Sequence, residues 1–184
     1  MQEQGTEPPE YRCRDEALIG ASPATCFTVL AELTTYGRWW TLVNVTPLDG
    51  GTILAPGVRF RFTGARPGGN ATSWVAAVLE VEPPSRIEIA YASGDLLGRT
   101  AWELAAEGDG TRVAYVYRGV RPNSPASTAS LARFGTRLHS VAMRVDALAG
   151  LARMLGGPGS ELADDVWRAR VQEHVAAGVR ALAR

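Results

Sequence analysis

The chain has 184 residues, of which 46% are hydrophobic and 21% charged, and its 19 basic and 19 acidic side chains give a net charge of zero. These values predict one globular domain and argue against a nucleic-acid-binding surface, which needs clustered basic residues. No apolar run of about 18 residues is present to span a membrane. Residues 1–10 lack the pattern of a secretory signal, so we expect a cytoplasmic protein.

The N-terminal part predicts a tail, a strand and a helix. Residues 1–10 are rich in Gln, Glu and Pro and predict a flexible tail, and residues 11–19 predict the first strand. Ser22 followed by Pro23 is a typical helix start, and this helix should run to about Leu33. A short second helix or turn is expected over residues 35–40.

Apolar and polar residues then alternate, which is typical of antiparallel strands with one buried face. In residues 58–63, for example, Val58, Phe60 and Phe62 alternate with polar side chains. Strands are predicted at 42–48, 58–63, 73–82, 86–92, 99–106 and 111–119, which makes seven with the first. The last two form a hairpin around residues 107–110.

Two helices are predicted after the strands. Apolar residues spaced three and four apart form one stripe from about Ala126 to Leu155, which predicts a single long helix. Residues 156–159 end it, and Ser160 is expected to cap a final helix within residues 160–184. The apolar face of that helix should pack on the domain or on a second copy in a homodimer.

Three stretches within this pattern resemble a known superfamily. They are SPATCFTVLAELTTYGRWW at 22–40, LEVEPPSRIEIAY at 79–91 and WELAAEGDGTRVAYVY at 102–117. With the long helix they resemble the START/Bet v 1-like (SRPBCC) superfamily over about residues 11–155. The resemblance implies an α+β helix-grip fold, in which a curved seven-stranded antiparallel sheet wraps around the long helix and encloses a cavity. Residues 160–184 would be an additional helix.

The implied cavity would be lined by side chains that the alternation turns inward. The expected lining residues are Phe60, Phe62, Trp74, Leu79, Ile89 and Trp102 on the strands, with Phe134, Leu138 and Val141 on the long helix. Such a lining is mostly apolar, as small-molecule pockets usually are. It predicts an apolar ligand, lipid- or polyketide-like.

Three tyrosines, Tyr91, Tyr115 and Tyr117, share the inward register. A phenol in a cavity can donate a hydrogen bond to a carbonyl or act as a general acid, and the alternative is an aromatic ring that only packs. Tyr117 is the first candidate, because it lies near the end of the last strand, where the cavity mouth is expected. The chain contains no lysine, which excludes a Schiff-base nucleophile.

The polyketide cyclases of the superfamily typically use an inward arginine beside tyrosine and tryptophan. This sequence departs from that pattern, because its strand arginines alternate with apolar residues and should face solvent. They are Arg59, Arg61, Arg99 and Arg118.

Cysteine and histidine spacing speaks against a metal site. Cys13, Cys26, His139 and His174 are the only residues of these two types, and none are paired at ligand spacing. We therefore expect no metal and no cofactor. His139 lies off the apolar stripe of the long helix and is expected on the surface or between helices.

Three functions remain open at this point. The protein could be a carrier, sensor or sequestering protein for an apolar molecule, or an enzyme of the polyketide cyclase/dehydratase type. It could also be a protein-interaction module like the heat-shock ATPase activators of the superfamily. Inward polar residues would favour the enzyme, and a purely apolar cavity would favour the carrier.

Overall fold

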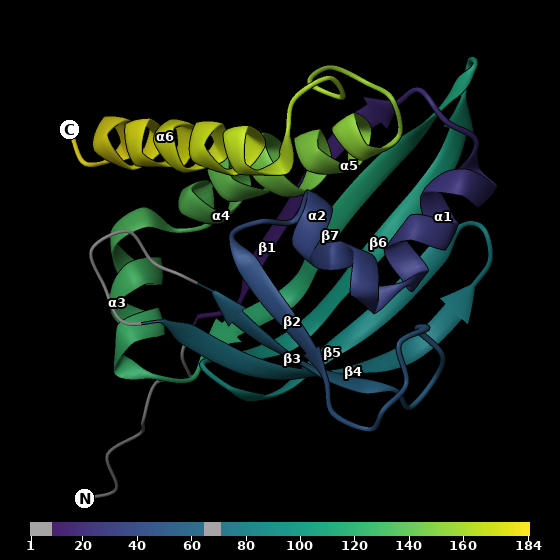
Figure 1. Ribbon diagram of the computed structural model, residues 1–184. Coiled ribbons are helices and arrows are strands. Elements are labelled where there is room, and N and C mark those ends of the chain that lie inside the picture. Colours follow the sequence, from purple (N-terminus) through teal and green to yellow (C-terminus); the bar gives the residue numbers. More distant parts are fainter. Residues whose placement is uncertain (1–8, 65–70) are drawn as a thin grey trace, which may run out of the picture.

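The computed structural model describes residues 9–64 and 71–184, so most of the expected N-terminal tail and residues 65–70, between two predicted strands, lie outside the described residues. Seven antiparallel strands form one sheet in the order β1-β7-β6-β5-β4-β3-β2, which curls into a half-barrel with helices on its concave side (Figure 1). The strands are β1 (Tyr11–Ile19), β2 (Val43–Pro47), β3 (Arg59–Gly64), β4 (Thr72–Glu82), β5 (Arg86–Gly94), β6 (Leu96–Glu107) and β7 (Gly110–Pro122). The predicted α+β fold and its seven-stranded sheet are confirmed.

The helices between β1 and β2 close one end of the half-barrel. Helix α1 (Pro23–Ala31) begins as predicted, with the Ser22 hydroxyl accepting a hydrogen bond from the Thr25 amide at 3.2 Å. It ends before Leu33, because the Ala31 carbonyl accepts a hydrogen bond from the Leu54 amide instead of continuing the helix. A 3₁₀ turn, η1 (Leu33–Thr35), and the short helix α2 (Tyr36–Trp39) follow.

The predicted single long helix is interrupted. It consists of α3 (Pro125–Phe134), α4 (Arg137–Ala142), the π-helical segment η2 (Met143–Leu148) and α5 (Ala149–Met154). The interruption between α3 and α4 occurs at Gly135, whose φ of 56° favours glycine over residues with a side chain. The apolar stripe continues across this point in the sequence, but α3 runs at a sharp angle to α4 (Figure 1).

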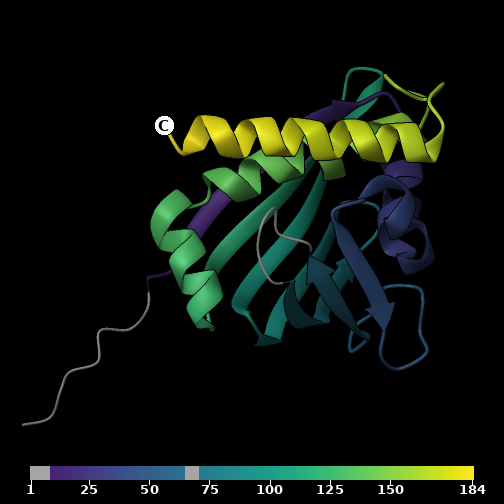
Figure 2. The same cartoon turned by 60° about the vertical axis from the view of Figure 1, so that its left-hand side comes forward.

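Helix α6 (Asp164–Leu182) packs on α4 and η2 (Figure 2). It begins at Asp164 rather than after the predicted cap Ser160, since residues 160–163 form a turn. Its buried residues Trp167, Val171 and Val175 form a second small core with, among others, Leu42, Val145 and Ala149. No helix in residues 9–64 and 71–184 is long and apolar enough to cross a membrane.

The contact between α4 and α6 is close, because a Cβ added at Gly178 would lie 2.6 Å from a methyl carbon of Val141. A hydrogen-bond and ion-pair network also holds the start of α6. The buried Arg153 guanidinium donates to the carbonyl oxygens of Gly159 and Leu162 and to the Asp164 carboxylate at 2.7 Å. Residues 164–182 therefore pack on their own chain.

The buried carboxylate of Asp146 ties η2 to the start of β2. Its two oxygens accept hydrogen bonds from the Thr41 amide, the Thr41 hydroxyl and the Leu42 amide at 2.8–2.9 Å. Burial raises the pKa of Asp146 to about 6, although these hydrogen bonds act in the opposite direction.

Replacing Asp146 with alanine is expected to lower the free energy of unfolding by about 3 kcal/mol, because the Thr41 and Leu42 amides lose their acceptors. The folded pKa lies above the unfolded value, so the contribution of Asp146 is fully present below about pH 4 and falls as the pH rises through about 6. Urea unfolding at pH 5 and pH 8 measures both effects. The exposed Glu173→Ala exchange on α6 is the control, and an equal loss in both variants would contradict the assignment.

Candidate functional site

A cavity of about 190 Å³, partly open to solvent, lies between the concave face of the sheet and helices α3 and α4. It sits where the helix is interrupted, so the turn at Gly135 moves α3 outward and makes space over the sheet. The lining comes from β2 to β7, α3, α4, η2, α6 and the segment between α2 and β2. It comprises Trp40, Leu42, Val43, Gly64, Thr72, Trp74, Tyr91, Leu96, Tyr117, Val120, Ser127, Ser130, Leu131, Gly135, Leu138, His139, Ala142, Met143 and Val175.

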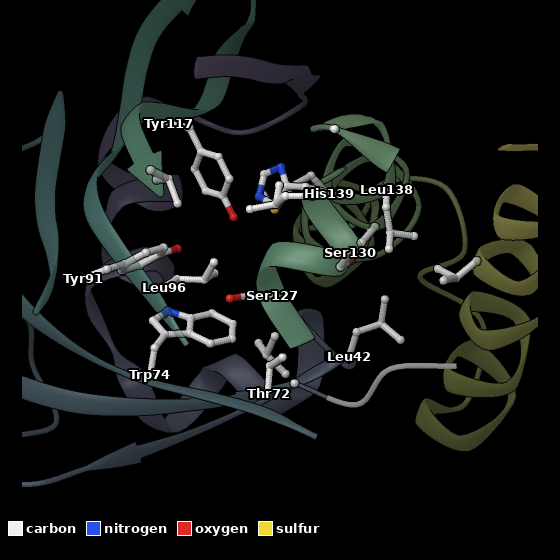
Figure 3. A pocket seen from close by; sticks show the side chains of 18 of the residues that line it. Leu42, Thr72, Trp74, Tyr91, Leu96, Tyr117, Ser127, Ser130, Leu138 and His139 are labelled. Atoms are coloured by element: carbon white, nitrogen blue, oxygen red, sulfur yellow. The ribbon is translucent and has the colours of Figure 1, made fainter. Parts of the chain in front are cut away.

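The lining is mostly apolar and aromatic, with few polar side chains. Figure 3 shows the rings of Trp74, Tyr91 and Tyr117 on the sheet side, and Ser127, Ser130, Leu138 and His139 on the helices opposite. Trp74 is buried, and its indole Nε1 has no hydrogen-bond partner within the described part of the chain. An unpartnered buried donor costs roughly 1–3 kcal/mol.

Two of the nine predicted lining residues, Trp74 and Leu138, line this cavity. Four others, Phe60, Phe62, Ile89 and Trp102, are at most 1% exposed and belong to the core beneath the cavity rather than to its wall. Alternation alone therefore predicted which side chains point inward. It did not separate the packed part of the half-barrel from the open part.

The remaining three predicted lining residues do not lie at the cavity. Leu79 is 41% exposed. Successive side chains of a strand point to alternate faces of the sheet, so Trp74 and Leu79, five residues apart, face opposite sides of β4. Val141 faces Gly178 on α6, and the Phe134 ring lies 4.9 Å from the Arg133 guanidinium. Val141 faces α6 because the helix restarts in a new direction after Gly135, whereas Phe134, the last residue of α3, is not part of the cavity lining.

The three candidate tyrosines are all buried, but their hydroxyls differ in surroundings. The Tyr91 and Tyr115 hydroxyl oxygens lie 2.5 Å apart, and Tyr115 donates to the Thr100 hydroxyl at 3.2 Å. Tyr115 does not line the cavity, whereas the Tyr117 hydroxyl points into it (Figure 3). Burial raises the pKa of all three phenols well above 10, so each is a neutral hydrogen-bond donor.

His139 lies at one end of the cavity, and the prediction that it would be a surface or interhelix residue is wrong. Its ring is tilted against that of Tyr117, with the two ring centroids 4.0 Å apart. Its Nδ1 lies 3.5 Å from Asp15 Oδ2 and 3.7 Å from Cys13 Sγ, both on β1. The stripe argument failed because it assumed one straight helix from Ala126 onward.

Asp15 is a buried carboxylate that the sequence argument missed. The signal was present, since Cys13, Asp15 and Ile19 share one face of β1 and Ile19 is a core residue. Burial by itself raises the pKa of Asp15. Hydrogen bonds from His139 and from the Ser140 hydroxyl, at 3.0 Å, together with the charges of His139 and Arg144, outweigh burial and hold the pKa below its ordinary value.

Cys13, Asp15 and His139 also form a group of potential metal ligands, whose donor atoms lie within 4.8 Å of one another. The spacing argument could not detect this group, because β1 and α4 lie more than 100 residues apart in the sequence. The expectation of no metal therefore stays a prediction. Burial raises the pKa of the Cys13 thiol to about 11, and the charge of Asp15 adds to this effect.

The strand arginines face solvent, as predicted. Arg59, Arg61, Arg99 and Arg118 are all exposed. Arg59 pairs with Asp49 at 2.8 Å, and Arg99 and Arg118 pair with Glu88 and Glu103. The sequence thus departs from the arginine-bearing cyclase pattern in the structure as well.

Comparison with solved structures shows the same fold in other proteins. TTHA0849 from Thermus thermophilus is 20% identical, with a TM-score of 0.64 over 78% of this chain and 96% of that chain. Ms6760 from Mycobacterium smegmatis is 15% identical, with a TM-score of 0.58 over 80% and 92% of the two chains. The di-domain ARO/CYC BexL from the BE-7585A biosynthetic pathway is 18% identical, with a TM-score of 0.53 over 77% of this chain and 45% of BexL.

No curated protein matches the chain significantly. A family model, described as activator of Hsp90 ATPase homolog 1-like protein, matches residues 20–141, which include β2 to β7, α3 and most of α4. The chain therefore belongs to this family and, through its fold, to the Bet v 1-like (SRPBCC) superfamily that its sequence resembles.

Proposed function

We propose that this protein binds an apolar small molecule, carrying at least one hydrogen-bond acceptor, in the cavity between the sheet and α3–α4. The observation that carries the proposal is a mostly apolar cavity into which the Tyr117 hydroxyl points beside the His139 ring (Figure 3). Binding pockets typically combine apolar walls with a small number of placed polar groups, which orient the ligand.

The size and lining of the cavity support a ligand with an aromatic ring or a short acyl segment. Its volume of about 190 Å³ exceeds that of an engineered apolar cavity of roughly 150 Å³ that takes up benzene. The rings of Trp40, Trp74 and Tyr91 supply aromatic faces, and the partly open wall allows a longer molecule to extend toward solvent. A lipid- or polyketide-like ligand fits this description.

We expect the neutral fluorophore N-phenyl-1-naphthylamine to bind saturably with one site per chain, because the walls are apolar and aromatic. Ser130→Phe, which adds a ring to the cavity lining, should abolish this binding. Ala129→Phe adds the same ring at the neighbouring exposed position of α3 and should leave binding unchanged. Fluorescence titration measures both variants. Equal binding by wild type and Ser130→Phe, or no saturable binding by wild type, would contradict the proposal.

The family name suggests a different use, in which the domain activates a chaperone ATPase through its surface. We favour the cavity because buried and half-buried polar groups converge on it, and a surface-binding module has no need of them.

The same polar groups favour a second candidate function over a passive carrier. This is an enzyme of the cyclase/dehydratase type, in which Tyr117 donates a hydrogen bond to the ligand carbonyl. Tyr91 and Tyr115 remain weaker candidates, since their hydroxyls are bonded to each other.

A further inference from the structure

We propose that His139, positioned by Asp15, is a proton acceptor acting on a carbonyl compound bound in the cavity. The inference rests on the proposed ligand-binding function and adds a chemical step to it. The ligand class is an aromatic or acyl ketone with hydrogen on the carbon next to the carbonyl. His139 would be the catalytic residue and Asp15 its positioning residue.

The geometry of the His139 ring supports this role. Nδ1 of His139 faces β1, where Asp15 Oδ2 lies at 3.5 Å. This is long for a hydrogen bond, but hydrogen bonds of this kind often shorten when a ligand is bound. With Nδ1 turned toward the sheet edge, the other ring nitrogen, Nε2, is free to face the cavity, and Figure 3 shows the ring next to the Tyr117 hydroxyl.

The negative charge of Asp15 also supports this role. The side chain of Asp15 has no exposed surface, and its ionised form is supported by Ser140 and by the Arg144 guanidinium at 3.2 Å. A buried anion next to Nδ1 favours the tautomer that carries its proton on Nδ1. Nε2 then has a free lone pair on the side of the ligand, which is the state that a general base needs.

The cavity also places a hydrogen-bond donor, Tyr117, beside the proposed base. The Tyr117 hydroxyl remains protonated because burial raises its pKa, so it can stabilise a negative oxygen. The proton on the ligand carbon moves to Nε2, and the electron pair of the broken C–H bond stays on the ligand as an enolate. The enolate oxygen accepts the hydrogen bond from Tyr117. Return of the proton from Nε2 to carbon restores the ketone, so no other reactant is needed.

Cys13 allows the base to be distinguished from a metal site. Its sulfur lies 3.7 Å from the same Nδ1, and a zinc ion held by Cys13, Asp15 and His139 would need all three side chains. A proton acceptor made of Asp15 and His139 does not depend on Cys13.

The test is hydrogen–deuterium exchange at the α-carbon of phenylacetone in D₂O, followed by proton NMR, with binding of the same ketone measured separately by tryptophan fluorescence. The wild-type protein should accelerate exchange above the buffer background. His139→Asn keeps a donor near the position of Nδ1 but lacks Nε2, and should lower the rate by about 10²–10⁴-fold while binding persists. The matched control is His174→Asn, which changes the only other histidine, exposed on α6, and should have no effect.

Asp15 has its own readout. In nitrogen-15 NMR spectra, His139 should carry its proton on Nδ1 in the wild type and on Nε2 in Asp15→Asn, and the exchange rate should fall in parallel. Cys13→Ala should keep both the tautomer and the rate, and a chelator should not change the rate.

The outcomes separate the two proposals. Phenylacetone and the fluorophore both failing to bind would count against the proposed function. Binding without accelerated exchange, or with full exchange in His139→Asn, would overturn the proton acceptor alone. Loss of exchange in Cys13→Ala together with loss on chelation would replace it by a metal site.

Discussion

A chain ending at Gly159 is expected to be less stable than the full chain by on the order of 5 kcal/mol, because three buried side chains of α6 each contribute roughly 1.5–3 kcal/mol. Trp167, Val171 and Val175 are at most 6% exposed, and their removal uncovers Leu42 and Val145. A loss of this size is a large part of the roughly 5–15 kcal/mol of a typical domain. Urea unfolding of the two chains gives the difference directly.

Two valine replacements in α6 provide a matched pair. Val171→Ala, at a position only 1% exposed, should cost about 2 kcal/mol. Val166→Ala, at a position 50% exposed in the same helix, should change the stability by less than about 0.5 kcal/mol. Equal effects of the two variants, or an unchanged melting temperature after truncation, would show that α6 does not stabilise the domain.

Light scattering of the truncated chain tests the predicted homodimer, whose mass should fall by half if α6 forms its interface.

Tyr117→Phe is expected to lower the rate of ketone enolisation by about 10²–10³-fold, because it removes a donor placed where negative charge develops. The ring and its contact with the His139 ring remain, so binding of the ketone should be kept. The pair of measurements therefore separates transition-state stabilisation from packing. Deuterium exchange and fluorescence titration on the same preparation provide both values.

Tyr115→Phe and Tyr91→Phe are the controls for this prediction. Their hydroxyls lie 2.5 Å apart, and Tyr115 also bonds Thr100, so we expect smaller losses from them than from Tyr117→Phe. Full activity in all three variants would refute a tyrosine donor. If ligands bind to every variant and to the wild type without any turnover, the protein is a carrier.

The fold was predictable because strand alternation, turn residues and a capped helix all pointed to the same arrangement. Phe60, Phe62, Tyr115 and Tyr117 are buried, as their positions in alternating strands required. The helix interruption was not predictable from the apolar stripe, because the three-and-four spacing passes through Gly135 without a gap. A glycine inside a helical pattern was the available signal, and its positive φ shows that it ends α3.

The site was predicted less well than the fold, and for a related reason. The positions of Tyr91, Tyr117, Trp74 and Leu138 at the cavity could be predicted, because each depends only on the local periodicity of its own element, and their roles stay predictions. The contact between His139 and Asp15 depends on the direction of α4 relative to β1, which no local pattern contains. The positions of Ser127 and Ser130 at the cavity were not predicted, because polar residues of an amphipathic helix are usually assigned to its exposed face.

The cavity wall includes a residue from the last helix, Val175, and one from the π-helical segment, Met143, and both lie outside residues 20–141, which match the family model. Asp15, which contacts His139 behind the wall, also lies outside them. The shape of the cavity is therefore set both by the family domain and by the segments that flank it. Because α6 contributes Val175 to this wall and packs on Leu42 and Val145 of the domain, a change of the C-terminal segment is expected to alter the shape of the cavity together with the stability of the domain.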